Sequence, residues 1–208
     1  MKTFEIIKQV SEYLKTPNKE ALELSLNNVH AKGIFSLVLN GTEFGRLTRV
    51  FFVDNKLKPF TVQYHTHRYP IRITVIKGNI THHTAVEVDT KKLESVSISK
   101  YNYRSFLNGG NGLSYVDDVN IVCHDFKLPI GSVIEMTSKE FHTMSCSKGS
   151  IWIVEELGFE TDCSQVLGVP FIADELYSKP EMFQVNDKCQ LLQKELLNII
   201  SSYNSIIN

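Results

Sequence analysis

The sequence predicts a mainly β fold with helices at both ends. Between residues 34 and 157, short runs rich in β-branched and aromatic residues alternate with turn-forming residues, which is typical of strands. Near both termini, apolar residues recur at intervals of three and four, which indicates amphipathic helices. The 208 residues suffice for one domain with its own core and are few for two. We therefore expect one domain over 1–208, with a helical extension over 1–32, a β core over 34–157 and a C-terminal helix over 180–207.

Two helices are expected before the first strand. The first ends near Thr16 and Pro17, and its apolar positions are Phe4, Ile7, Val10 and Leu14. Asn18 is an N-cap candidate for a second helix that would run through Val29, with Gly33 just past its end. A strand over 22–26 is the alternative to the middle of this second helix.

The β core is expected to consist of short strands. Strand-like runs cover 34–39, 47–53, 63–78, 81–88, 93–99, 131–142 and 150–155. The pairs Asn40-Gly41 and Asp54-Asn55 provide turn signals between and after the first two runs.

Two segments are predicted to be irregular. The segment 101–120 is aromatic, basic and glycine-rich, and a loop of this length in a compact domain is either a ligand-facing lid or disordered. Its run of glycines at 109–112 matches no phosphate-binding fingerprint. The segment 159–171 is expected to be irregular as well. The helix that follows should pack on the β core or make a dimer contact.

The composition argues against several classes of partner. The net charge is -1 and the pI is near 6.7, so there is no electrostatic case for nucleic acid or an anionic membrane. No apolar run approaches the roughly twenty residues of a membrane span, and the N-terminus lacks the apolar core of a signal peptide. We expect a cytoplasmic protein whose partner is a small molecule. Four scattered cysteines indicate neither a disulfide framework nor a structural zinc site.

Three histidines stand out in the β core. His65 and His67 are two residues apart on an extended run, so both would project to the same face of a strand. His142 lies about seventy-five residues later in a similar strand setting. Three imidazoles from two hairpins could hold one small metal ion.

These residues resemble the two motifs of the cupin superfamily. His65, His67 and Gly78 fit the first motif, and Gly131 and His142 fit the second at the family's spacing. The carboxylate position of the first motif holds Ile71 or Arg72, and 137–139 reads Thr-Ser-Lys where the family has Pro-x-Gly. The resemblance covers roughly 51–156 and implies a double-stranded β-helix, or jelly-roll, barrel.

The resemblance also implies a metal site and an activity. Cupins without the carboxylate resemble the thiol dioxygenase branch, in which three histidines alone hold ferrous iron. The implied metal ligands are thus His65, His67 and His142, with Fe(II) as the metal and nickel, manganese or zinc as alternatives. The implied catalytic residues are Tyr64 and Arg72. The implied substrate-binding residues are Arg68, Tyr69 and Arg104, because an arginine can pair with a substrate carboxylate through two hydrogen bonds. Jelly-roll barrels commonly pair, so a homodimer is expected by analogy.

Other interpretations of the same residues remain open. Many cupins have lost their metal and bind a sugar, nucleotide or metabolite in the barrel. His82 and His83 are interpreted as a solvated strand end, and His30 and His124 are left outside the site. Glu140 could support a ligand imidazole, but a role in a surface turn is favoured. A phosphoesterase with paired H-x-T motifs is disfavoured because 82–84 alone fits, and a reactive cysteine at Cys123 or Cys146 is disfavoured by its surroundings.

Overall fold

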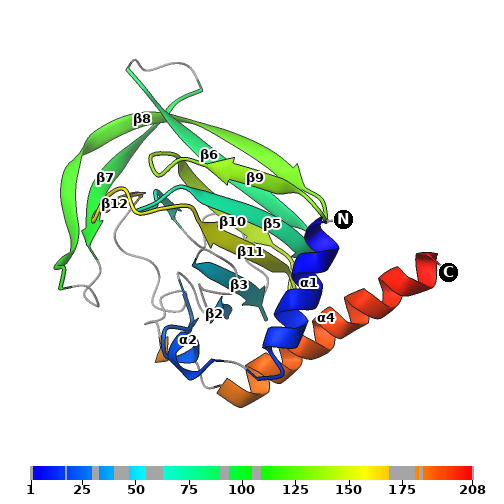
Figure 1. Cartoon of the computed structure of the whole chain (residues 1–208). Coiled ribbons are helices and arrows are strands. Elements are labelled where there is room, and N and C mark those ends of the chain that lie inside the picture. The colour runs from blue at the N-terminus through cyan, green and yellow to red at the C-terminus, as the bar shows by residue number, and fades with distance from the viewer. Residues whose placement is uncertain are drawn as a thin grey trace.

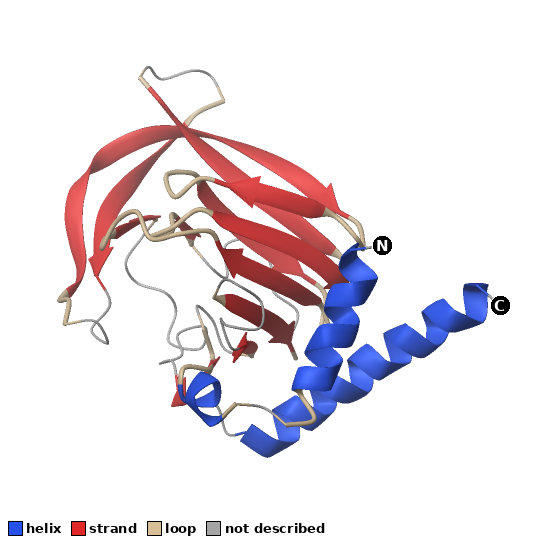
Figure 2. Ribbon diagram, viewed as in Figure 1, coloured by secondary structure: helices blue, strands red, loops and turns tan. Residues whose placement is uncertain are grey.

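Two antiparallel sheets make up most of the computed structural model, and the helices α1 and α4 lie outside the sheets (Figure 1, Figure 2). The structure describes residues 2–16, 18–29, 33–39, 47–54, 63–89, 94–104, 109–168, 181–182 and 185–207. The predicted turn at Asn40-Gly41, Asn55, His30 and the stretch 169–171 lie outside these ranges.

The helices and strands follow one another in the order expected of a β core with flanking helices. The helices are α1 (Lys2–Tyr13), α2 (Lys19–Glu23) and α4 (Val185–Ile207). The strands are β1 (Leu26–Asn27), β2 (Ile34–Leu39), β3 (Thr48–Val53), β4 (Tyr64–His65), β5 (Ile71–Lys77), β6 (Ile80–Val88), β7 (Val96–Arg104), β8 (Gly112–Leu128), β9 (Val133–Met136), β10 (Phe141–Cys146), β11 (Ile151–Glu156), β12 (Ser164–Leu167) and β13 (Glu181–Met182). Among the described residues, no helix combines the length and apolar character that a membrane span requires.

Both sheets combine strands that are consecutive in the sequence with strands that are distant in it. The first has seven strands in the order β13-β1-β2-β3-β11-β5-β9. The second has the order β10-β4-β12-β7-β8-β6 and closes on itself because β6 pairs with β10. This mainly β, two-sheet arrangement with N-terminal helices and a C-terminal helix is cupin-like, which confirms the predicted fold class.

Three apolar clusters stabilise the fold. One lies between the helices and the first sheet, where Leu192 and Leu196 of α4 pack with Val10 of α1 and with Leu37 and Ile151. A second combines residues of both sheets, and a third is formed by residues of the second sheet alone. The predicted packing of the C-terminal helix on the β core is therefore observed.

The second predicted helix is shorter than expected. Asn18 caps it as predicted, since its side-chain oxygen accepts hydrogen bonds from the backbone of Glu20 and Ala21. The helix ends at Glu23, however, and Leu26–Asn27 pairs with both β2 and β13. Pairing with two neighbouring strands outweighs the helical propensity of this segment.

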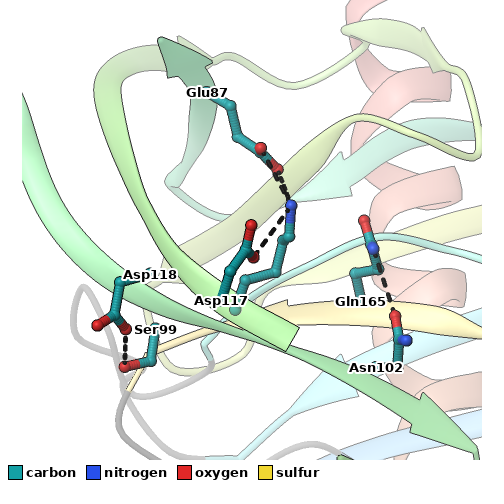
Figure 3. Close-up of polar contacts among 7 residues, drawn as sticks. Glu87, Ser99, Asn102, Asp117, Asp118 and Gln165 are labelled. Carbon is teal, nitrogen blue, oxygen red and sulfur yellow. Dashed lines mark hydrogen bonds and ion pairs between the residues drawn. The ribbon is translucent and has the colours of Figure 1, made fainter. Parts of the chain in front are cut away.

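The prediction of a loop at 101–120 is wrong over most of its length, and the irregular segment predicted over 159–171 is interrupted by a strand at 164–167. The first segment forms the long hairpin of β7 and β8, and the second contains β12. Polar cross-strand contacts replace an apolar face here: Lys100 pairs with Glu87 and Asp117, and the Ser99 hydroxyl donates to Asp118 (Figure 3). The tip at 105–108 lies outside the described residues, so the lid interpretation is untested there.

The glycines of the two motifs offer a matched pair of stability tests. Gly78 has φ +95°, and a Cβ there would lie 2.8 Å from Ser150 Cα. Gly131 has φ +86° but nothing within 4 Å of such a Cβ. Both alanine variants should lose about 1–2 kcal/mol through the left-handed backbone. Gly78→Ala should lose about 1–3 kcal/mol more through overpacking. Equal losses in urea unfolding would show that the contact with Ser150 is unimportant.

Candidate metal centre

The three predicted histidines meet at one point of the second sheet. His65 on β4 lies directly opposite His142 on β10 in the antiparallel register. His67 follows two residues after His65, outside any strand, because β4 ends at His65. One ring nitrogen from each of the three lies within 4.8 Å of the others. The predicted continuous strand over 63–78 is therefore wrong, yet the chain still brings His67 to the other two.

Backbone contacts explain why the chain leaves the sheet after His65. The Thr66 amide donates to Gln165 O, and the Arg68 carbonyl accepts from the amides of Glu160 and Thr161. Pro70 then precedes β5 and offers no amide hydrogen for a strand ladder. Residues 66–70 thus run outside the sheet, and the imidazole of His67 lies against that of His142.

The ring contacts fit a shared cation. Nε2 of His67 and Nε2 of His142 are 2.8 Å apart, and the centroid of the His142 ring lies 4.9 Å from that of His65. The Nδ1 atom of His65 is 2.9 Å from the carbonyl oxygen of Gln63. Because a carbonyl only accepts, Nδ1 of His65 carries the hydrogen and Nε2 is its ligating nitrogen. Burial lowers the pKa of His65, which favours the neutral imidazole that metals bind.

Sequence reasoning missed His82. The predicted solvated strand end is wrong, since the side chains of His82 and His83 are only 5% and 6% exposed. Nε2 of His82 lies 3.1 Å from Nδ1 of His142, at the edge of the ring opposite the cluster. The neighbouring His83 contacts Asp125 at 2.6 Å and Ser145 at 2.9 Å instead. In the register of β6 with β10, His83 pairs with Thr143 and Thr84 pairs with His142. Because side chains alternate along a strand, His82 and His83 point to opposite faces of the sheet.

Both predicted catalytic residues lie away from the cluster. Tyr64 precedes His65 on β4, so its ring points to the other face and packs in a cluster with Phe141 and Leu167. Burial and a hydrogen bond with Cys123 raise its pKa. Arg72 lies on the face of β5 opposite the buried Ile71 and Ile73, where it pairs with Glu135 and Glu155. The structure therefore does not bring Tyr64 or Arg72 to the histidines.

Of the three predicted substrate-binding residues, the structure brings Tyr69 to the cluster. Its ring stacks on that of His67 at 6.2 Å. The guanidinium of Arg68 lies 6.0 Å from the centroid of the Tyr69 ring. Arg104 forms an ion pair with Asp162 and lines a cavity of about 280 Å³ with Asn102 and Cys163. Arg104 is three residues along β7 from Tyr101, which pairs with Val166 opposite His65, so Arg104 is separated from the cluster.

Tyr69 contacts the ion pair of Glu156 with Arg49, which the sequence analysis did not predict. Burial and a hydrogen bond with Glu156 raise the pKa of Tyr69 to about 12, so its hydroxyl remains protonated at neutral pH. Glu156 in turn accepts a hydrogen bond from Nε of Arg49 at 3.0 Å. Arg49 faces the same side of the first sheet as the buried Val154. The sequence offered one signal for this ion pair, since Arg49 is the single charged residue in the apolar run 48–53. These contacts support the tyrosine beside His67.

The buried His82 predicts a loss of stability in acid. Burial, with a smaller contribution from His83, lowers the pKa of His82 to about 4. Its ordinary value is 6.5, so between these pH values the unfolded chain binds a proton that the folded chain does not. The free energy of unfolding should therefore fall as the pH falls, by about 3 kcal/mol in total from this group. Urea unfolding of metal-free protein should show a shallower pH dependence in His82→Gln, and identical slopes would contradict the assignment.

Comparisons with known proteins give weak and partial similarities. No protein-family model matches the sequence, and no curated protein is significantly similar to it. Hydroxypropylphosphonic acid epoxidase from S. wedmorenis has 14% identity and a TM-score of 0.38, over 64% of this chain and 54% of that one. Vicilin from Solanum melongena has 12% identity and a TM-score of 0.33, over 84% and 41%. L-ribose isomerase from Cellulomonas parahominis has 11% identity and a TM-score of 0.34, over 92% and 93%.

The chain thus spans about half the length of the epoxidase and less than half of the vicilin. The fold assignment comes from the sheets themselves. Two antiparallel sheets, with the histidines of both sequence motifs gathered at one point, confirm the resemblance of this chain to the cupin superfamily.

Proposed function

We propose that the chain is a metal-dependent cupin enzyme of the mononuclear non-haem dioxygenase type, acting on a small polar molecule that contains a thiol. The observation that carries this proposal is the convergence of one nitrogen from each of His65, His67 and His142 within 4.8 Å. Neutral imidazoles suit iron, nickel, copper and zinc, and three protein ligands leave positions open for substrate and oxygen. We favour ferrous iron, which would supply oxygen chemistry when bound.

The charge of the donor set supports an anionic substrate group. The cluster formed by the described residues contains three imidazoles and no carboxylate. Three neutral ligands leave both positive charges of a divalent cation uncompensated, and burial strengthens the attraction for an anion. A thiolate or carboxylate of the substrate would supply the missing negative charge. Tyr69, whose ring stacks on that of His67, is the side chain that we expect to pack against such a substrate.

Oxygen consumption tests this activity. Protein loaded anaerobically with ferrous iron should consume oxygen when mixed with small thiols that carry a carboxylate. Their oxygen analogues, with a hydroxyl in place of the thiol, should support little consumption. His67→Ala should be inactive with every compound. Tyr69→Ala should raise KM because the ring beside His67 is lost. Iron-loaded wild type that consumes no oxygen with any thiol would overturn the dioxygenase assignment.

A ligand-binding cupin without turnover is the second candidate. The specific observation in its favour is the 2.8 Å contact between Nε2 of His67 and Nε2 of His142, because one imidazole can donate to the other without a cation. This candidate predicts no metal uptake by the purified protein. It also predicts that a sugar, nucleotide or metabolite raises the melting temperature of the metal-free protein.

A further inference from the structure

We propose that His82 is a positioning residue for the metal site, because it accepts a hydrogen bond from Nδ1 of His142 and so holds Nε2 of His142 ready to ligate. This inference rests on the proposed metal site and adds a member that the two sequence motifs do not contain. His82 itself is not a ligand: its Nε2 approaches the ring edge of His142 that faces away from His67.

The two nitrogens of His142 have different neighbours. Nε2 is 2.8 Å from Nε2 of His67, inside the cluster, and Nδ1 is 3.1 Å from Nε2 of His82. A neutral imidazole carries one hydrogen, and a nitrogen that binds a metal must present its lone pair. If Nε2 of His142 ligates, the hydrogen is on Nδ1 and is donated to His82. His82 then carries its own hydrogen on Nδ1.

The contrast with His65 shows why the identity of residue 82 matters. The partner of His65 Nδ1 is the carbonyl oxygen of Gln63, which can only accept, so the backbone fixes that tautomer for any side chain at residue 63. The partner of His142 Nδ1 is another imidazole, which can donate or accept. The tautomers of His82 and His142 are therefore coupled. His82 is 5% exposed and His142 is 3% exposed, so bulk water competes poorly for this contact.

The strand register explains the contact and provides a control. His82 on β6 faces Met144 on β10, and Thr84 faces His142, so His82 and His142 are diagonal neighbours on one face. His83 is equally buried but contacts Asp125 and Ser145 on the other face. A substitution at His83 disturbs a buried strand position without touching the cluster.

Metal affinity is the first test, measured with zinc by competition against a chromophoric chelator. His82→Phe should weaken zinc binding roughly 10–100-fold, the usual cost of losing a hydrogen-bond partner of a ligating histidine. His82→Gln should restore most of the affinity because its amide oxygen can accept from Nδ1 of His142. His83→Phe should leave the affinity unchanged. Equal affinity in wild type and His82→Phe would overturn the proposal, as would equal losses in the Gln and Phe variants.

The tautomer of His142 is the second test, and it requires only the wild type. Imidazole ¹⁵N and ¹H NMR of the zinc-loaded and metal-free protein should place the hydrogen of His142 on Nδ1 in both states. A hydrogen on Nε2 in the loaded protein would overturn the role of His82. If the wild type binds no zinc while His142 carries its hydrogen on Nδ1, the hydrogen bond is correct and the proposed metal site is wrong.

Discussion

Replacing His142 by alanine is expected to abolish tight metal binding, with a larger effect than alanine at His65 or His67. The three ring centroids are almost equally spaced, at 4.9 to 5.0 Å, so what distinguishes His142 is its support. Its Nδ1 atom contacts His82, a buried side chain that would lose its partner in the variant. Removing a ligand should cost more than the roughly 10–100-fold expected for the loss of a supporting partner. Competition titration with zinc measures the affinity.

His124→Ala provides the matched control for this experiment. His124 lies opposite Thr84 in the strand register, but its side chain is exposed on β8. Its removal should leave zinc affinity unchanged. Comparable zinc affinity in wild type and His142→Ala would refute the ligand assignment, whatever the stability of the variant.

Replacing Trp152 by alanine is expected to cause the largest loss of stability. Trp152 on β11 is 4% exposed and stacks on Phe51 of the neighbouring β3, with ring centroids 5.3 Å apart and an angle of 2° between the planes. It belongs to the cluster that holds the two sheets together. Truncation removes a large apolar surface and leaves a cavity, so about 3–5 kcal/mol should be lost in urea unfolding followed by circular dichroism.

Trp152→Phe is the conservative variant for comparison, because it keeps an aromatic ring at this buried position. A phenylalanine can still stack on Phe51, so the loss should be clearly smaller than in Trp152→Ala. Equal losses of the free energy of unfolding in the two variants would contradict both the cavity argument and the contribution of the stacked pair.

The sequence predicted those parts of the fold that carry a regular apolar pattern. The first helix, with apolar residues at helical spacing, and the strands β2, β3, β5 and β11, whose apolar runs are buried on both faces, carry such patterns, as does the first part of β6. The hairpin of β7 and β8 does not, because most of its side chains are exposed on both faces and its stability comes from strand pairing and ion pairs. A glycine-rich, polar segment of this kind has the composition of a loop. β7 and β8 pair with each other, and their outer partners, β12 and β6, are far from the predicted loop in the sequence.

The candidate site was also predictable only in part. The spacing of His65, His67 and His142 could be recognised in the sequence. Which face of its sheet each other side chain points to depends on the pairing register of the strands. Alternation along β4 already places Tyr64 opposite His65, and that signal should have excluded it. Arg49 and Arg72 are each the second residue of a largely apolar strand, and only the register of β11 with β3 and β5 shows which of them faces inward. His82 was hidden because its neighbour His83 is buried too, on the other face.

The most direct test of the central claim is the metal content of the chain itself. Protein purified without a metal-chelating tag would be exposed anaerobically to ferrous iron, freed of excess metal and subjected to elemental analysis. The three-histidine site predicts about one equivalent of metal per chain in the wild type and its loss in His67→Ala. Wild type that retains no metal, or His67→Ala that retains as much as the wild type, would contradict it.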